Sequence, residues 1–218
     1  MHCKKVSASR DRLLDPAAAE WASIPGESLK MTATPLANQP SEYIKASRDE
    51  RKIGKVRRLM VQAGHNGTDI FFRLSWEDPG KDEAITENDV FPDGCGILMP
   101  LNGGDPPIDE MGSKDAPVNA WFWRADFKDV PRNTIAHGLG TTEFSKKCPI
   151  QTKSLWGHGA WAVVFVRSLA VPEQKNEATQ LTPGTAVKIG FAVWEGSNGE
   201  RAGLKSFSKE WRELQLET

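Results

Sequence analysis

The sequence predicts an all-β fold: a single antiparallel β-sandwich with long loops and one or two short helices over its 218 residues. Three observations support this prediction. Several stretches have the length and apolar alternation of strands, turn residues recur between them at hairpin spacing, and helical periodicity is scarce. Many short strands at such spacing are typical of a sandwich.

The first hairpin is predicted within residues 56–76, where two strand-like runs flank Asn66-Gly67. Both turn residues tolerate positive φ, which makes this dipeptide a strong hairpin signal. The charged stretch that follows carries Pro79-Gly80 and is interpreted as a solvated loop. A meander is therefore expected to begin here.

Further strands are predicted along the rest of the chain, separated by loops. Residues 102–118 are rich in Gly, Pro and Asp and indicate a long excursion, and residues 130–154 are expected to be irregular with one short helix. After the first hairpin, strands are predicted at 94–101, 119–126, 186–194 and 211–217, and residues 157–169 are predicted to form a turn followed by a long strand.

The chain is predicted to form one domain, residues 1–218, without an internal repeat or a dividing linker. Residues 1–50 mix apolar and turn residues without a clear period. They are expected to wrap around the sandwich.

Composition excludes several classes of protein. The net charge of −1 gives no electrostatic footprint for nucleic acid or an anionic membrane. The longest apolar cluster, residues 160–166, is strand-sized and too short to span a membrane. Three cysteines without a Cys-x-x-Cys pair encode neither a zinc knuckle nor an iron–sulfur site. The N-terminus is not an intact secretory signal, so composition alone favours the cytoplasm.

Common catalytic motifs do not occur in the sequence. The stretch Gly199-Glu-Arg-Ala-Gly-Leu-Lys205 has some likeness to a phosphate-binding loop, but its spacing is one residue short. Of the four histidines, His65 and His158 lie in turn contexts and are expected to have solvent or turn roles. No zinc or copper centre is indicated by their spacing.

Four segments occurring in one order resemble a known family. The chain is similar, from about residue 56 to the C-terminus, to the haem b-binding γ subunits of periplasmic type II dimethyl-sulfoxide-reductase-family molybdoenzymes, with ethylbenzene dehydrogenase as the nearest likeness. The segments are Phe91-Pro-Asp-Gly-Cys-Gly-Ile-Leu-Met-Pro100, Val118-Asn-Ala-Trp-Phe-Trp-Arg-Ala-Asp126, Gly157 to Leu169, and Phe191-Ala-Val-Trp-Glu-Gly with Glu200-Arg-Ala-Gly-Leu-Lys-Ser-Phe-Ser208.

The resemblance implies one haem b held between the sheets, with a methionine and a lysine as axial ligands. Lys205 matches the family lysine. Met99 falls in the strand where the family places its methionine, although a one-residue slip would turn Leu98 to the haem instead. Met111 is the second candidate. The competing interpretations are a surface lysine and methionines that fill the core.

Other residues are assigned to the pocket on weaker grounds. Gly94 and Gly96 would allow a flat macrocycle to approach the backbone closely. Trp121 and Trp123 share one strand face and either line the haem or fill the core. Arg124, Lys188 and Arg201 are candidates for propionate contacts from their charge alone.

The function implied by the resemblance is electron transfer without catalysis in this chain. With both axial positions filled by protein, a haem iron has no open site for substrate. The expected partners are a molybdenum-containing α subunit, an iron–sulfur β subunit and a soluble electron carrier. The expected location is the periplasm, reached by export with a signal-bearing partner subunit. Neither the substrate of the complex nor the direction of electron flow follows from the sequence.

A second hypothesis is a carbohydrate-binding β-sandwich module. The chain has eight Trp and one Tyr, and exposed Trp faces can stack on sugar rings. Lys205 would then be incidental.

Overall fold

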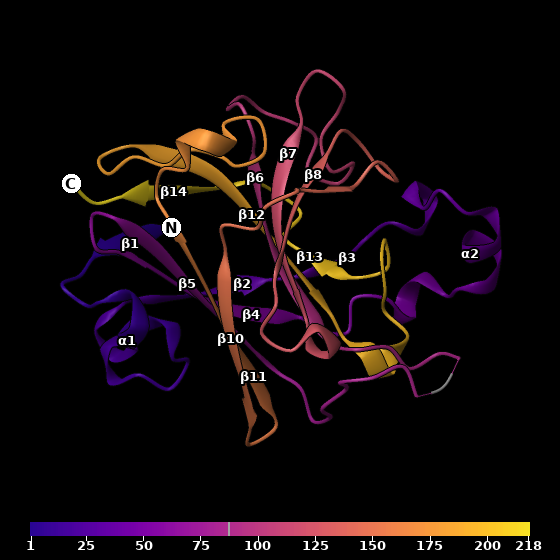
Figure 1. Ribbon diagram of the computed structural model, residues 1–218. Coiled ribbons are helices and arrows are strands. Elements are labelled where there is room, and N and C mark those ends of the chain that lie inside the picture. The colour runs from indigo at the N-terminus through magenta and orange to yellow at the C-terminus, as the bar shows by residue number, and fades with distance from the viewer. Residues whose placement is uncertain (87) are drawn as a thin grey trace.

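A computed structural model describes residues 1–86 and 88–218 of the chain (Figure 1). Within these residues there are two short α-helices, six short 3-10 helices and fourteen strands. The strands are β1 (His2–Lys5), β2 (Gly26–Lys30), β3 (Thr32–Ala33), β4 (Arg58–His65), β5 (Asp69–Glu77), β6 (Gly94–Pro100), β7 (Val118–Arg124), β8 (Arg132–Ala136), β9 (Glu143–Phe144), β10 (Gln151–Gly157), β11 (Ala160–Ser168), β12 (Ala186–Trp194), β13 (Ser206–Phe207) and β14 (Arg212–Leu216). The α-helices are α1 (Arg10–Leu14) and α2 (Glu42–Ser47), and the 3-10 helices are η1 (Ala19–Ser23), η2 (Leu36–Asn38), η3 (Glu50–Lys52), η4 (Ala125–Phe127), η5 (Pro172–Gln174) and η6 (Gly196–Asn198).

The strands follow one hydrogen-bonded path that folds into two layers. Its order is β10-β11-β5-β4-β1-β14-β12-β6-β7-β8-β9, with β2, β3 and β13 attached at its sides. The first layer contains β2, β4, β5, β10 and β11, and the second contains β6 to β9, β12 and β13. In Figure 1, α1 lies beside the first layer and α2 projects on the opposite side of the molecule, near β3 and β13.

The prediction of a β-sandwich agrees with this architecture, but the expectation of a purely antiparallel fold was wrong. Strand β1 pairs in parallel with both β4 and β14 and so joins the two layers. No tight turn connects β1 to either neighbour, and only a direct hairpin would force the antiparallel arrangement. The first residues of the chain are thus part of the sheet.

The core lies between the inner faces of the two layers. Alternate side chains of β5 and β11 pack against alternate side chains of β6, β7 and β12. The rings of Phe72 and Trp121 meet edge to face at 5.7 Å, and those of Trp123 and Trp161 at 5.1 Å. Because these rings fill the inner face of β6 and β7, only the outer face of the two strands is available for contacts outside the core.

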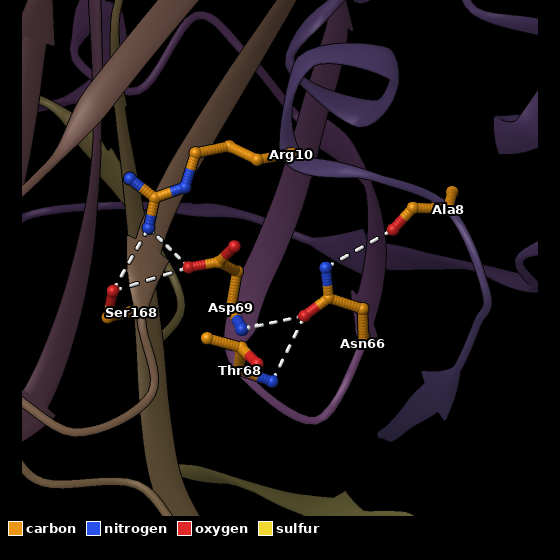
Figure 2. A network of polar contacts seen from close by, with 6 residues as sticks. All are labelled: Ala8, Arg10, Asn66, Thr68, Asp69 and Ser168. Atoms are coloured by element: carbon orange, nitrogen blue, oxygen red, sulfur yellow. Dashed lines mark hydrogen bonds and ion pairs between the residues drawn. The ribbon is translucent and has the colours of Figure 1, made fainter.

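The predicted hairpin at Asn66-Gly67 is confirmed and joins β4 to β5. Gly67 has a φ of +90°. The Asn66 side-chain oxygen accepts hydrogen bonds from the backbone N–H groups of Thr68 and Asp69, at 3.0 and 2.8 Å. Its amide donates to the carbonyl of Ala8, as Figure 2 shows, so the turn also holds the N-terminal segment.

The same end of the sheet contains an ion pair. Arg10 pairs with Asp69 and donates to the hydroxyl of Ser168 on β11 (Figure 2). Asp69 and Ser168 are themselves cross-strand partners. The N-terminal segment is therefore fastened to the first layer by side chains as well as by β1 and β2.

Residues 130–154 were predicted to be irregular with a short helix, and this prediction was wrong. They contain β8, β9 and the start of β10. β8 lacks the usual alternation of apolar and polar residues because two of its buried residues, Asn133 and Thr134, are polar. Their burial is possible because hydrogen bonds satisfy them. Asn133 bonds to Asn119 and to the carbonyl of Glu177.

No helix in the described part of the chain has the length and apolar character needed to cross a membrane.

Replacing Trp121 with Ala is expected to lower the free energy of unfolding by about 3–5 kcal/mol, because a fully buried aromatic side chain leaves a large cavity. Urea denaturation followed by circular dichroism measures the change. Leu155→Ala is the control, since Leu155 is 48% exposed, and it should cost less than about 1 kcal/mol. Equal losses in the two variants would contradict the assignment of the core.

Candidate functional site

The outer face of the second layer carries several small residues at its centre. Strand pairing aligns Gly96 of β6 with Ala192 of β12 on one side and Phe122 of β7 on the other. In the neighbouring rows Gly94 pairs with Trp194, and Leu98 with Ala120. Directly opposed residues point to the same face of a sheet, so these side chains lie away from the core.

An indole ring lies over the two glycines of this face. An added Cβ on Gly94 or Gly96 would lie 3.6 and 3.7 Å from ring atoms of Trp194. It would also lie 3.1 and 3.0 Å from the carbonyl oxygens of Trp123 and Trp121 on the adjacent strand. A side chain at either position would be pressed against these carbonyl oxygens, whereas its contact with the indole ring would be an ordinary van der Waals contact.

Lys205 is held at this face by a tightly bonded loop that ends in β13. Its carbonyl accepts a 3.0 Å hydrogen bond from the Thr34 N–H, and its own N–H donates to the Thr34 hydroxyl at 3.3 Å. The Lys205 Nζ lies 5.4 Å from the centre of the Trp194 ring. The side chain therefore points over this face and not into solvent.

The Lys205 side chain is buried, with the residue only 8% exposed. No ion pair to Lys205 occurs within residues 1–86 and 88–218. Burial lowers the pKa of its amine from 10.5 to about 8. The neutral amine is thus accessible near neutral pH, and it carries a free lone pair that can bind a metal.

The Met111 side chain contacts the Lys205 amine. Its Sδ lies 3.9 Å from Lys205 Nζ. Met111 has a φ of +58°, in the left-handed region that costs a residue with a Cβ about 1 kcal/mol. Strained backbone of this kind is often found at ligand sites, where the surrounding structure enforces it.

The structure divides the residues singled out from the sequence into two groups. Gly94, Gly96 and Lys205 share the outer face, and Met111 reaches it from residues 102–117. Met99, Trp121 and Trp123 are fully buried on the inner face of β6 and β7. Leu98, which the one-residue slip anticipated, lies on the outer face opposite Ala120.

Two of the three residues considered for propionate contacts are engaged with carboxylates. Arg124 pairs with Asp126 at 2.6 Å, and Lys188 with Asp105 at 2.7 Å. Arg201 stacks on the ring of Phe91 at 4.2 Å. Arg132 was not anticipated: it is the cross-strand partner of Phe122 and stacks on Phe127 at 4.6 Å.

The two histidines considered from the sequence lie in a turn or directly before one. His158 lies in the turn between β10 and β11 with a φ of +53°. His65 ends β4 and accepts a 3.3 Å hydrogen bond from the Gly67 N–H. It is fully buried, so the expected solvent role does not apply to it.

A cluster of buried carboxylates lies at the ends of β5, β6 and β12, and sequence reasoning missed it. Asp78, Asp93 and Glu195 are all buried, and they offer oxygens within 4.8 Å of one another. Burial and then the two neighbouring carboxylates raise the pKa of Asp78 to about 7. Burial raises the pKa of Asp93 to about 6, against hydrogen bonds from Gly196 and Trp161.

Comparison with known proteins shows similarity over most of the chain. The ethylbenzene dehydrogenase family matches residues 18–148 and 143–206. The respiratory nitrate reductase heme subunit ORF7 of Haloferax mediterranei is 32% identical over 93% of this chain and 68% of its own length. The chlorate reductase γ subunit of Ideonella dechloratans is 33% identical over 73% of this chain and 65% of its own length.

The dimethylsulfide dehydrogenase γ subunit of Rhodovulum sulfidophilum is 30% identical over 90% of this chain and 73% of its own length. Among solved structures, a carbohydrate-binding protein of Bacteroides uniformis superposes with a TM-score of 0.58 at 10% identity, covering 100% of this chain and 98% of the other. A family 9 carbohydrate-binding module from Caldicellulosiruptor kristjanssonii, in complex with glucose, has a TM-score of 0.50 at 9% identity, covering 100% and 95%. At such identities these structures establish a shared β-sandwich fold and nothing about ligands.

Replacing Lys205 with Met should stabilise the ligand-free chain at pH 7. Because its folded pKa of about 8 lies below the unfolded value of 10.5, the charged amine destabilises the folded state below pH 8. The gain is expected to reach at most about 3 kcal/mol, at 1.36 kcal/mol per pKa unit, and to vanish as pH rises from 8 to 10.5. Urea denaturation across this range measures it, with exposed Lys209→Met as the control. A gain that does not change with pH would contradict the buried amine.

Replacing Asp78 with Asn should make the free energy of unfolding change less with pH between pH 4 and 8. The folded pKa of Asp78, about 7, lies above its unfolded value of 3.8, so its favourable contribution is complete below pH 3.8 and is lost as pH rises through 7. The amide introduced by this substitution keeps an oxygen for the Gly80 N–H. Denaturation between pH 4 and 8 should show a flatter profile than the wild type, whereas Asp126→Asn should leave the profile unchanged. An unaltered slope in the Asp78→Asn variant would sink the interpretation.

Proposed function

The chain belongs to the ethylbenzene dehydrogenase family, and from this premise we propose that it is a haem-binding electron-transfer subunit of an oxidoreductase complex. The family assignment made from the four sequence segments is thereby confirmed. The observation that carries the proposal is the pair formed by Lys205 and Met111: a buried amine without a described carboxylate partner faces a thioether across 3.9 Å.

The chemistry of the pair suits haem iron. A deprotonated amine nitrogen and a thioether sulfur each carry a lone pair that can be donated to iron. The two side chains are brought into direct contact, with Lys205 Nζ 3.9 Å from Met111 Sδ. A haem so ligated supplies reversible one-electron transfer and has no position for substrate.

Within this proposal, Met111 takes precedence over Met99 as the thioether ligand. Met99 is fully buried in the core between the layers, on the face of β6 opposite to Gly94 and Gly96. Its sulfur could reach Lys205 only if β6 shifted register by one residue, which would expose Met99 and bury Leu98. The geometry therefore favours a haem on the outer face of the second layer.

The remaining residues of this face have roles that follow from their shapes. The rows around Gly94 and Gly96 and the ring of Trp194 would contact the macrocycle. The 3.9 Å contact closes the space between the two ligands, so binding requires the Met111 loop to open. Arg132 and Arg201 both have no described carboxylate partner, and we assign Arg132 to a propionate because it stands opposite Phe122 at the edge of this face.

The wider assignment extends the same proposal. The haem would be of the b type, held by a single domain of residues 1–218. The chain would be a non-catalytic γ subunit that relays electrons between an iron–sulfur β subunit and a soluble carrier. A molybdenum-containing α subunit would perform the chemistry, and the complex would work in the periplasm. Support comes from three relatives, described as a heme subunit of nitrate reductase and as γ subunits of chlorate reductase and dimethylsulfide dehydrogenase.

Carbohydrate binding, the alternative from the sequence, has less support in the site. Five of the eight Trp residues are buried: Trp21, Trp76, Trp121, Trp123 and Trp161. Trp194 is half-buried, but its indole N–H donates to the Ala202 carbonyl and its ring faces the Lys205 amine. The remaining two, Trp156 and Trp211, are also half-buried, so none of the Trp residues is exposed as a platform for stacking on sugar rings.

The proposal is tested by the absorbance spectrum of the purified chain loaded with haem. The wild type should show a low-spin, six-coordinate spectrum, and Lys205→Ala and Met111→Ala should each convert it to a high-spin or water-ligated form. Met99→Leu preserves core volume and should leave the spectrum unchanged. Failure to bind haem would overturn the proposal, and a spectral change in Met99→Leu without one in Met111→Ala would overturn the ligand assignment.

A further inference from the structure

A strongly basic segment lies beside the Lys205 loop. Residues 45–58 contain seven Lys or Arg against two Asp or Glu, a local charge of +5 in a chain whose net charge is −1. Two of the seven are balanced by ion pairs, Lys45 with Glu42 and Arg51 with Asp49. The other five form no ion pair with the described residues and are Arg48, Lys52, Lys55, Arg57 and Arg58. We call these five residues the basic strip.

Backbone and side-chain contacts fix the basic strip against the loop that positions Lys205. The carbonyl of Lys52 accepts a 2.6 Å hydrogen bond from the Asn198 side chain, and the N–H of Lys55 donates to Glu200 at 2.8 Å. The Arg48 guanidinium lies 3.0 Å from the position of an added Cβ on Gly199. The strip is therefore part of the rim around the candidate site.

The charges of the strip are exposed and their arrangement is unfavourable for the isolated chain. Lys52, Lys55, Arg57 and Arg58 are exposed, and Arg48 is half-buried. Arg58 stands directly opposite Lys30, which is also exposed, on the paired strands β4 and β2. Like charges directly opposite each other destabilise a sheet. A binding partner of opposite charge would remove that repulsion.

We propose that the basic strip is the docking surface for an acidic protein that exchanges electrons with the site at Lys205. This inference rests on the proposed function and names its partner by chemistry. Complementary charge steers two proteins together and sets their orientation. Docking on the rim places the partner beside the redox centre.

A protein fits the surface better than an anionic membrane does. The segment carries exposed Glu50, and exposed Glu42 lies just before it; a continuous anionic surface would repel both. Tyr43 of α2 is 76% exposed beside them. Tyr is a frequent anchor of protein interfaces because it combines a large apolar face with a hydroxyl group. Mixed charge with an exposed aromatic residue indicates a surface of defined shape.

The first test needs no haem. Fluorescently labelled poly-L-glutamate is titrated with the full chain at low ionic strength, and binding is followed by anisotropy. The wild type should bind in a salt-dependent manner, and Lys52→Glu/Lys55→Glu should weaken binding at least about tenfold. The matched control, Lys147→Glu/Lys175→Glu, makes the same change of charge on exposed residues remote in sequence and should bind as the wild type does. Equal weakening in both variants would overturn the proposal.

The second test uses two small oxidants of opposite charge with the reduced, haem-loaded chain. Ferricyanide takes one electron from the ferrous haem and becomes ferrocyanide, and tris(phenanthroline)cobalt(III) takes one and becomes the cobalt(II) complex. Stopped-flow absorbance should show that Lys52→Glu/Lys55→Glu slows the anionic oxidant about threefold or more at low salt and accelerates the cationic one. A change of driving force would move both rates in the same direction.

The outcomes separate the two proposals. A chain without haem absorbance fails the proposed function, while the poly-L-glutamate result still decides on the strip. If the double substitution changes neither oxidation rate of the haem-loaded protein, the docking surface alone is overturned. Co-sedimentation with phosphatidylglycerol vesicles that the double variant abolishes, together with unchanged oxidation rates, would assign the strip to a membrane instead.

Discussion

The candidate site depends on one buried amine. Lys205 lies under Trp194 and against Met111 without a described carboxylate partner, and burial lowers its pKa to about 8. A charge in such a place costs free energy unless something takes up the amine lone pair or supplies a counter-charge. Coordination to a metal does the first. The strained backbone at Met111 and the two glycines beneath Trp194 become intelligible as parts of the same site.

The sandwich creates this site by using the two faces of one sheet differently. On β6 and β7, Met99, Trp121 and Trp123 point inward and seal the core, while Gly94, Gly96 and Phe122 point outward. The bulky residues of the inner face fill the core, and on the outer face the ring of Trp194 lies over Gly94 and Gly96. The loop bearing Lys205 is tied to Thr34 of the N-terminal segment, so that segment helps to position the amine.

Much of this could be predicted from local sequence. Asn66-Gly67 identified the first hairpin because its turn chemistry is local, and the alternation of the longer strands predicted a sandwich. Lys205 was found through family resemblance, since nothing in its immediate sequence distinguishes a buried lysine from an exposed one. Met111 ranked below Met99 because Met99 falls in the strand where the family places its methionine, and the contact of Met111 with Lys205 is made only in the tertiary structure. The cluster of Asp78, Asp93 and Glu195 was missed for a related reason: the two ends of the β5–β6 connection meet the start of the loop after β12, which is distant in sequence. β8 escaped recognition because its buried polar residues are satisfied by partners that only the tertiary structure supplies.

The most direct measurement of the central claim is a crystal structure of the haem-loaded chain with the iron located by its anomalous scattering. The account predicts one iron on the outer face of the second layer, bound by Lys205 Nζ on one side and Met111 Sδ on the other. An iron between the two layers bound to Met99, or an iron with water in place of Lys205, would contradict it.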